Sequence, residues 1–288
     1  MVCSVQDVLA ATRHIDKLDA ELLLAYVLKK QREYIVTHPK RSLSMTERLT
    51  YQWLVRKRKN HVPLAHITGH QAFFSLDFLV NRHTLVPRPD TEVLVERAIE
   101  ILKEKEHAVL VDVGTGSGAI PIAILNASPL LAKEGLGEMK TFATDISKGA
   151  LRVAKKNATR RNVDITFLHG NLLEPFLARS PLPVSHSPIL ITANLPYLTE
   201  AQFANENSIQ KEPKSALVAN ENGLALIREL LEQIQCASIS NATILLEYDP
   251  DQSSALQKIV VTIFPKASVR VHKDLAGRDR VCEICLQQ

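Results

Sequence analysis

A planar nitrogen could be bound by four consecutive residues, Asn194, Leu195, Pro196 and Tyr197. An amide nitrogen is a poor nucleophile because its lone pair is delocalised, so a site must hold it in a reactive position. The Asn194 side-chain oxygen and a backbone carbonyl could accept its two N–H groups, while proline fixes the turn and the aromatic ring packs against the planar target. Asn and Pro are also common where a strand simply turns. The residues therefore indicate a flat amino or amide target only if other motifs accompany them.

A glycine-rich loop provides such a motif. It reads Gly114, Thr115, Gly116, Ser117 and Gly118, follows an apolar strand and opens a predicted helix. Glycines let the backbone turn sharply and approach a ligand closely. Read as GxGxxA, the loop would bind a dinucleotide with its pyrophosphate at the helix N-terminus. With Asp112 two residues before the first glycine, the spacing instead resembles motif I of class I S-adenosylmethionine methyltransferases.

Two further polar residues follow the next predicted strands. Asp145 could accept hydrogen bonds from both hydroxyls of a ribose. Nicotinamide cofactors and S-adenosylmethionine both need such an acceptor. It could also cap the helix that begins near Ser147. Asn171 follows a third strand, at the place where enzymes that resemble class I methyltransferases contact the adenine.

The elements that must position these residues alternate from residue 109 onward. Strands are predicted at 109–113, 140–144, 165–168, 189–193, 243–247, 268–271 and 280–286, and helices at 119–127, 147–161, 222–237 and 251–263. This alternation predicts an α/β fold with an open, mostly parallel sheet, whose last strand could pair antiparallel. The tetrad then ends the fourth strand. In that position it resembles the tetrad of enzymes that methylate glutamine amides, adenine N6 or cytosine N4.

The first 60 residues are predicted to be helical, because apolar residues recur at spacings of three and four. Asp19 and Ser44 are the expected helix caps, and a basic run at 56–59 would end a helix where cations oppose its dipole. After Gly69, a phenylalanine-rich segment predicts a β-hairpin.

Composition excludes several classes of protein. Of 288 residues, 45% are apolar and 23% are charged, so the chain can bury a core. It has no long uncharged apolar run and no signal-peptide pattern, and its four cysteines form no disulfide framework, so we expect a cytoplasmic protein without a membrane anchor. Residues 1–85 hold 13 Lys and Arg against seven Asp and Glu, which predicts either docking to an anionic partner or an ordinary solvated surface.

The segment PRPDTEVLVE (87–96), just before the glycine loop, resembles the signature of the peptide chain release factor glutamine N5-methyltransferases. The resemblance continues through the tetrad, EPKSAL (212–217) and DLAGRDRV (274–281), and covers most of the chain. It implies a Rossmann-like class I methyltransferase sheet at 84–288, a helical substrate-docking domain at 1–70 and a hairpin linker at 71–83. It further implies methyl transfer from S-adenosylmethionine to the Gly-Gly-Gln glutamine of class 1 release factors, by a monomer that need not bind nucleic acid.

By that resemblance, the cofactor would contact 114–118, Asp145, Asn171, Leu172 and Asn194, and the glutamine would be held by 194–197. The chain departs from the family pattern at Leu195, where the tetrad is usually NPPY. The backbone acceptor survives this change and the turn loses rigidity. Insertions are expected at 129–138 and 179–188, and Leu172 stands where an aromatic residue often covers the adenine.

Other functions explain less of the sequence. NLPY also occurs in ribosomal RNA adenine dimethyltransferases, so an adenine N6-methyltransferase acting on RNA or DNA is the alternative. A nicotinamide-dependent dehydrogenase would account for the glycine loop and Asp145, but it would give residues 194–197 no function. Cys282 and Cys285 have no second pair, so we expect no metal. We expect no carboxylate partner for His61, His66 and His70, and we expect them at a surface or interface.

Overall fold

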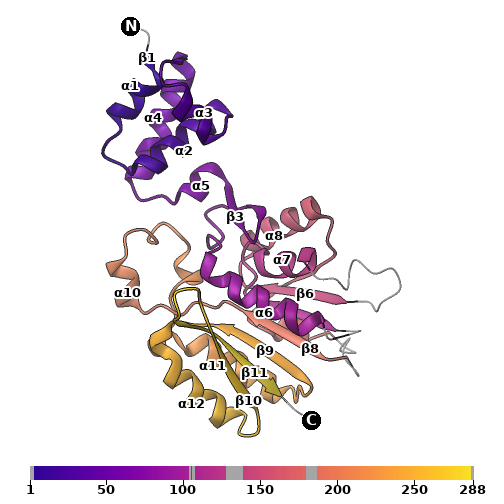
Figure 1. Cartoon of the computed structure of the whole chain (residues 1–288). Helices are drawn as coiled ribbons and strands as arrows, with labels where there is room; N and C mark the ends of the chain where they lie inside the picture. The colour runs from indigo at the N-terminus through magenta and orange to yellow at the C-terminus, as the bar shows by residue number, and fades with distance from the viewer. Residues whose placement is uncertain (1–2, 104, 106–107, 128–138, 180–186, 287–288) are drawn as a thin grey trace.

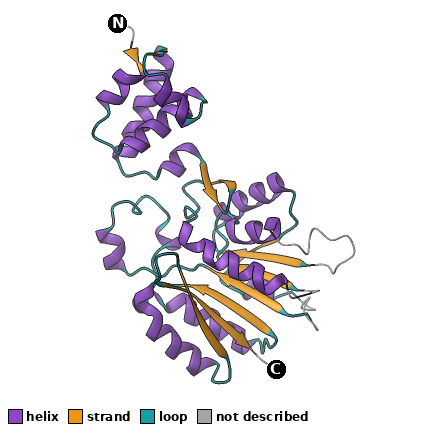
Figure 2. Cartoon of the chain, viewed as in Figure 1, coloured by secondary structure: helices purple, strands orange, loops and turns teal. Residues whose placement is uncertain are grey.

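The computed structural model describes residues 3–103, 105, 108–127, 139–179 and 187–286. Within them, a seven-stranded sheet has the order β10-β11-β9-β8-β5-β6-β7 (Figures 1 and 2). Its strands are β5 (Val109–Val113), β6 (Lys140–Asp145), β7 (Thr166–His169), β8 (Ile189–Ala193), β9 (Ala242–Glu247), β10 (Ser268–Lys273) and β11 (Asp279–Leu286). Among these strands, β11 runs antiparallel to both of its neighbours, β9 and β10, and the other neighbouring pairs are parallel. The predicted α/β sheet with an antiparallel last strand is confirmed.

Helices cover both faces of the sheet, so its central strands are buried. One face packs against α6 (Glu92–Lys103), α7 (Ala119–Ala127) and α8 (Lys148–Arg161). The other packs against α9 (Glu174–Leu177), α11 (Ala225–Cys236) and α12 (Ser253–Ile263). Every residue of β5 and β8 is buried, which explains their nearly continuous apolar sequences. The predicted insertion at 129–138 and most of that at 179–188 lie outside the described residues.

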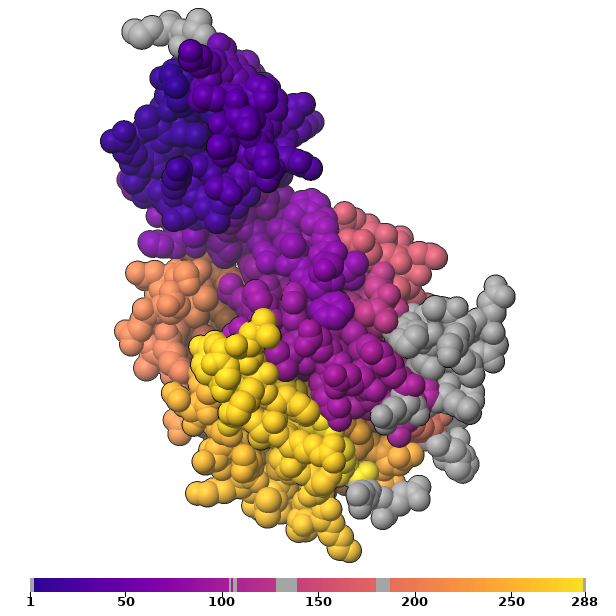
Figure 3. Space-filling view, viewed as in Figure 1, coloured from indigo at the N-terminus to yellow at the C-terminus, as the bar shows by residue number. Residues whose placement is uncertain are grey.

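The N-terminal part packs around a core of its own, formed by residues such as Val5, Leu23, Ile35 and Tyr51. Figure 3 shows it as a lobe at one end of the molecule. Its elements are β1 (Cys3–Ser4), α1 (Val5–Ala11), α2 (Lys17–Leu28), α3 (Arg32–Thr37), β2 (Ser42–Leu43), α4 (Met45–Lys59) and α5 (Leu64–Thr68). None of the helices in the described residues is long and apolar enough to cross a membrane.

The helix caps are partly as predicted. Ser44 caps α4, and residues 56–59 form the last turn of that helix. Asp19 is not a cap, because Asp16 caps α2 by accepting the backbone N–H groups of Leu18 and Asp19. The Asp19 side chain instead accepts a hydrogen bond from Arg58, which joins α2 to α4.

The predicted hairpin is β3 (His70–Phe73) and β4 (Leu76–Leu79). Phe73 and Phe78 are buried edge to face, with ring centroids 6.1 Å apart. Asn157 of α8 bonds both backbone groups of Leu79, at 2.8 and 2.9 Å, and so holds the hairpin against the sheet domain. His70 does have a carboxylate partner, contrary to expectation: its Nδ1 lies 2.8 Å from Asp77 Oδ2, because the hairpin folds residue 77 back beside it.

The remaining segments connect the sheet to the site. They are α10 (Glu200–Asn205) and the short 3-10 helices η1 (Pro89–Thr91), η3 (Lys214–Ala216), η4 (Glu221–Gly223) and η5 (Pro250–Gln252). Element bounds differ from the predicted ranges by one to three residues at several ends. The largest shift is at α11, which begins at Ala225 rather than 222, because Asn222 and Gly223 have positive φ angles and cannot continue a helix.

Candidate active site

A cavity of about 380 Å³ opens at the carboxyl ends of the parallel strands. Within the sheet, β6 lies next to one edge of β5 and β8 lies next to its other edge, so the strand order reverses direction at β5. Ligands of open α/β sheets bind at such a point. Ten of the predicted site residues line the cavity: Gly114, Thr115, Gly116, Ser117, Asp145, Asn171, Leu172, Asn194, Leu195 and Pro196. Gly118 and Tyr197 do not line it. Four segments far apart in sequence therefore meet at one edge, as predicted.

The glycine loop is shaped by positive φ angles. Gly116 has φ +56°, and a Cβ built there would meet no atom within 4 Å, so this residue faces the open cavity. Gly118 serves a different purpose, since a Cβ there would lie 3.0 Å from Ile122 and 3.2 Å from Ala154. It allows α7 and α8 to approach closely, which explains why it does not line the cavity.

Asp145 ends β6 and binds the loop. Its Oδ2 accepts the Gly116 N–H at 2.8 Å and its Oδ1 accepts the Ser147 N–H at 2.7 Å. Burial raises the pKa of this carboxyl above its ordinary value. The cap of α8 is Ser147, whose hydroxyl accepts the Ala150 N–H. Asp145 is therefore not the helix cap, and its carboxylate lines the cavity.

The wall beside Asp145 is apolar. Ile146 lines the cavity with 66% of its surface exposed, although large aliphatic residues are usually buried. The sequence prediction missed this residue, and the signal that could have found it is an apolar side chain directly after the acid. Leu172 lines the same cavity, with φ +42°. Asn171 donates to Glu229 at 2.6 Å, so its amide nitrogen is already engaged by the protein.

The tetrad is anchored by a buried carboxyl group that the sequence prediction also missed. The Asn194 Nδ2 donates to Glu247 Oε2 at 2.8 Å and to Thr91 Oγ1 at 3.1 Å. The Tyr197 hydroxyl donates to Glu247 Oε1 at 3.3 Å. Glu247 is 1% exposed, and burial raises its pKa to about 7. Because the amide nitrogen of Asn194 is held on the protein side, its oxygen is turned towards the cavity.

Tyr197 is held by contacts within the protein. Its hydroxyl is bound to Glu247 and burial raises its pKa well above the ordinary value. Its ring does not line the cavity. Its carbonyl oxygen accepts a 2.8 Å bond from Gln252, which also donates to the Asn222 carbonyl at 2.7 Å. In this structure, Tyr197 supports the turn that presents Asn194.

Leu195 also differs from expectation. The sequence assigns it only a backbone acceptor, whereas its side chain is 3% exposed and lies within the core on the α11 and α12 side of the sheet. Its Cδ2 would be 3.0 Å from a Cβ at position 114. The side chain therefore packs beneath the glycine loop. This packing, and not the rigidity of the turn, links the tetrad to motif I.

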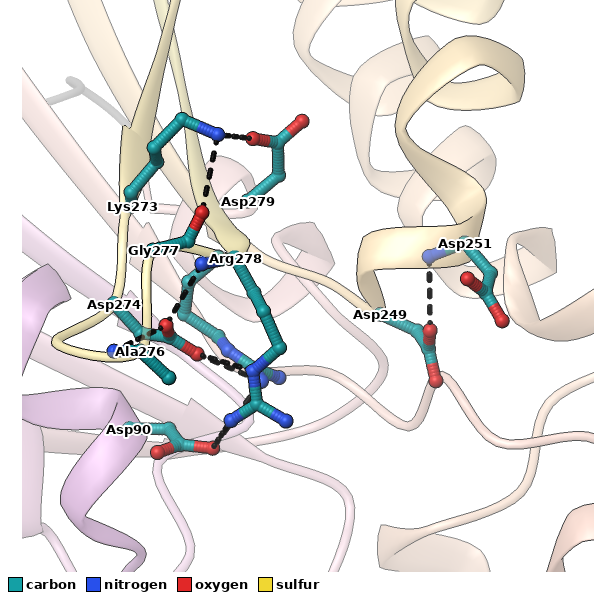
Figure 4. Close-up of polar contacts among 10 residues, drawn as sticks. Asp90, Asp249, Asp251, Lys273, Asp274, Ala276, Gly277, Arg278 and Asp279 are labelled. Atoms are coloured by element: carbon teal, nitrogen blue, oxygen red, sulfur yellow. Dashed lines mark hydrogen bonds and ion pairs between the residues drawn. The ribbon is translucent and has the colours of Figure 1, made fainter.

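The segments that surround the tetrad are held by ion pairs. Glu212 accepts the Val86 N–H at 2.8 Å and pairs with Arg88. Asp90 lies 3.2 Å from Arg280 and 3.9 Å from Arg278. The Asp274 carboxylate accepts hydrogen bonds from the backbone N–H of Arg278 at 2.9 Å and from its Nε at 3.1 Å (Figure 4). These contacts fix η1, and with it Thr91, beside Asn194.

Comparisons with known proteins agree with this geometry. Residues 5–69 match the model of the PrmC N-terminal domain, and residues 89–191 match that of ribosomal protein L11 methyltransferase (PrmA). Among solved structures, the N-terminal domain of human METTL16 resembles the chain with a TM-score of 0.51 at 14% identity, over 92% of this chain and 94% of that one. A likeness at this identity shows the fold alone.

The sheet, the glycine loop after β5 and the acid at the end of β6 define a class I methyltransferase, a fold that implies a methyl donor of the S-adenosylmethionine type. The release factor glutamine methyltransferase of Shewanella oneidensis is 35% identical over 94% of this chain and 90% of its own length. That of Enterococcus faecalis is 36% identical over 76% and 74%. The chain belongs to the release factor glutamine methyltransferases.

Proposed function

We propose that this chain transfers a methyl group from S-adenosylmethionine to the side-chain amide nitrogen N5 of the Gly-Gly-Gln glutamine of class 1 release factors. The observation that carries the proposal is the orientation of Asn194. Its Nδ2 is bound to Glu247 and Thr91, so its oxygen is the atom available to a ligand in the cavity. That oxygen can only accept a hydrogen bond, and a primary amide offers two N–H donors.

The cavity fits the proposed cofactor in three respects. The Asp145 carboxylate lies at its wall, where it can accept hydrogen bonds from ribose hydroxyls. Ile146 and Leu172 provide apolar surface for a planar base. Gly116 leaves open space beside the loop, so that the rest of the ligand can approach the backbone. Bound there, the cofactor supplies an electrophilic methyl group on a sulfonium sulfur.

The protein's part in the reaction is to position the nitrogen. Asn194 Oδ1 accepts one N–H of the glutamine, and the Leu195 carbonyl accepts the other. With S-adenosylmethionine bound, the nitrogen held by these two acceptors would face the methyl carbon, so that an N–C bond would form as the S–C bond breaks. The alkylated nitrogen is acidic and releases its proton to water. Holding two reactants in line can contribute about 7–11 kcal/mol to lowering a barrier, so no strong general base is needed.

The helical part is proposed as the docking domain, with boundaries at 1–70, a linker at 71–83 and the catalytic domain at 84–288. Its surface supports that role. Met45, Leu49 and Trp53 lie one turn apart on α4 and are 55–66% exposed, and the basic end of the same helix follows them. Apolar surface of this kind marks protein contacts. We further propose that the enzyme acts as a monomer in the cytoplasm, and that its contact with the substrate requires no nucleic acid.

The test is incubation with S-adenosylmethionine labelled in its methyl group, using three possible substrates. These are a class 1 release factor, the same factor with alanine in place of the Gly-Gly-Gln glutamine, and ribosomal RNA. We expect label in the first alone, and none when the enzyme carries Asn194→Ala. Label in RNA and not in the release factor would support the adenine N6 alternative and overturn the proposal.

A further inference from the structure

The side-chain amide of Asn194 has two ends of nearly equal size but opposite hydrogen-bonding character. Its nitrogen only donates and its oxygen only accepts, so a half-turn of the group would present the wrong end to a substrate amide. Shape alone does not exclude that half-turn. The orientation must be set by the groups that contact the amide on the protein side, which are Thr91 and Glu247.

Of these two groups, only the carboxylate distinguishes the ends of the amide. The Thr91 hydroxyl can donate or accept, so it can pair with either end of Asn194. An ionised carboxylate only accepts, and it would repel the Asn194 oxygen if the amide turned round. Glu247 also accepts the Tyr197 hydroxyl, so one buried group contacts both ends of the tetrad.

We propose that Glu247 is a positioning residue, which holds Asn194 with its oxygen towards the substrate and so makes the site selective for an N–H donor. This inference rests on the proposed function. Glu247 ends β9, where it is paired with Val281 of β11, so two strands fix its backbone. The group acts through Asn194 and is not expected to touch the substrate.

The proposal predicts a pH dependence. A protonated Glu247 could donate to the Asn194 oxygen, and the selection would be lost. The titratable and charged groups near Glu247 are Tyr197 after β8, Arg280 on β11 and Asp90 on η1. Burial raises the pKa of Glu247 to about 7, so activity should fall about tenfold between pH 8 and pH 6, as a single group takes up its proton.

The experiment compares Glu247→Gln and Glu247→Ala with a matched control, Glu283→Gln. Glu283 is also a buried carboxylate, bound to Arg97 and His272 at 2.7 Å each, and it does not line the cavity. At pH 8, we expect kcat to fall about tenfold in Glu247→Gln and about 100-fold in Glu247→Ala, because a neutral partner holds the amide less strongly and no partner leaves it free. The cofactor KM should change less than twofold, and Glu283→Gln should match the parent.

The pH profile separates positioning from a merely structural role. In Glu247→Gln, activity should vary less than twofold between pH 6 and pH 8. Asp112, whose pKa burial also raises to about 7, is bonded to Thr192 and remains in both proteins, so the difference between the profiles belongs to Glu247. If Glu247→Gln kept the parent's kcat and the parent's decline below pH 7, the proposal would be overturned.

A spectroscopic readout keeps this inference distinct from the proposed function. The Asn194 side-chain amide can be assigned in a nitrogen–proton correlation spectrum by its loss in Asn194→Ala. We expect its proton signals to shift near pH 7 in the parent and in Glu283→Gln, but not in Glu247→Gln. An Asn194 signal that ignores Glu247 would overturn the inference, whereas the expected shifts without release factor methylation would count against the proposed function alone.

Discussion

Gly223 lies directly against the carbonyl group of Tyr197. A Cβ at position 223 would fall 1.9 Å from the Tyr197 oxygen and 2.4 Å from Gln252 Nε2, which donates to that same oxygen. The residue also has φ +86°, a conformation that side chains other than hydrogen disfavour. The tetrad can therefore reach its position only because residue 223 is glycine.

Gly223→Ala should displace the tetrad turn. Because the added methyl group meets backbone, we expect a loss of more than about 2 kcal/mol in the free energy of unfolding, together with loss of methylation. Gly69→Ala is the matched control, since Gly69 has φ +81° but open space around a Cβ. It should cost only the strain of the backbone, about 1 kcal/mol. Urea unfolding of both variants measures the difference, and equal losses would show that the contact with Tyr197 is relaxed at no cost.

Asp145→Ala should chiefly weaken cofactor binding. A carboxylate that accepts ribose hydroxyls contributes about 1.5–3 kcal/mol, which corresponds to a roughly 10- to 100-fold higher Kd. Part of that loss would come from the glycine loop, because Asp145 also holds the Gly116 N–H. Titration calorimetry with S-adenosylmethionine tests this expectation. Tight binding of NADH by the parent chain, with no binding of S-adenosylmethionine, would favour a dehydrogenase instead.

Leu195→Pro is expected to reduce stability, although the family pattern NPPY would suggest that proline improves the turn. Rigidity gained in the unfolded chain contributes about 0.4–1 kcal/mol. The side chain of Leu195 is buried against Gly114, and truncating a buried leucine costs about 2–5 kcal/mol, so the lost packing should outweigh the gain. Thermal unfolding of Leu195→Pro and Leu195→Ala checks this, with Leu195→Ala losing more. A melting temperature above the parent's for Leu195→Pro would contradict it.

At high pH, the buried and ionised carboxylate of Glu247 should lower the free energy of unfolding. Burial raises its pKa from 4.5 to about 7, so the folded protein binds this proton more tightly than the unfolded chain does. The stability that this proton contributes is present below about pH 4.5 and is lost as pH rises through 7. The free energy of unfolding of Glu247→Gln, compared with that of the parent, should therefore rise by about 1–3 kcal/mol when the pH is raised from 5 to 8. Urea unfolding at both pH values measures it. A difference that does not change with pH would show that Glu247 titrates normally.

The sequence by itself determined the elements and the edge at which the site lies. The strands predicted at 109–113, 140–144 and 189–193 are followed directly by a glycine, an acid and an asparagine, so candidate site residues stand at their carboxyl ends. Parallel strands bring those ends to one edge, so Gly116, Asp145 and Asn194 had to meet there. Local patterns suffice for this inference because each strand and its following loop are continuous in sequence.

Only the tertiary structure decided which side chains hold the tetrad in place. Asn194 is bound by Glu247, 53 positions later, and by Thr91, 103 positions earlier. Leu195 is buried beneath Gly114, and Asp19 accepts a hydrogen bond from Arg58, 39 positions later. Such partners depend on strand order, register and the packing of side chains from distant segments. No local pattern carries that information, because the same acid at the end of a strand could equally face solvent, a helix or the site.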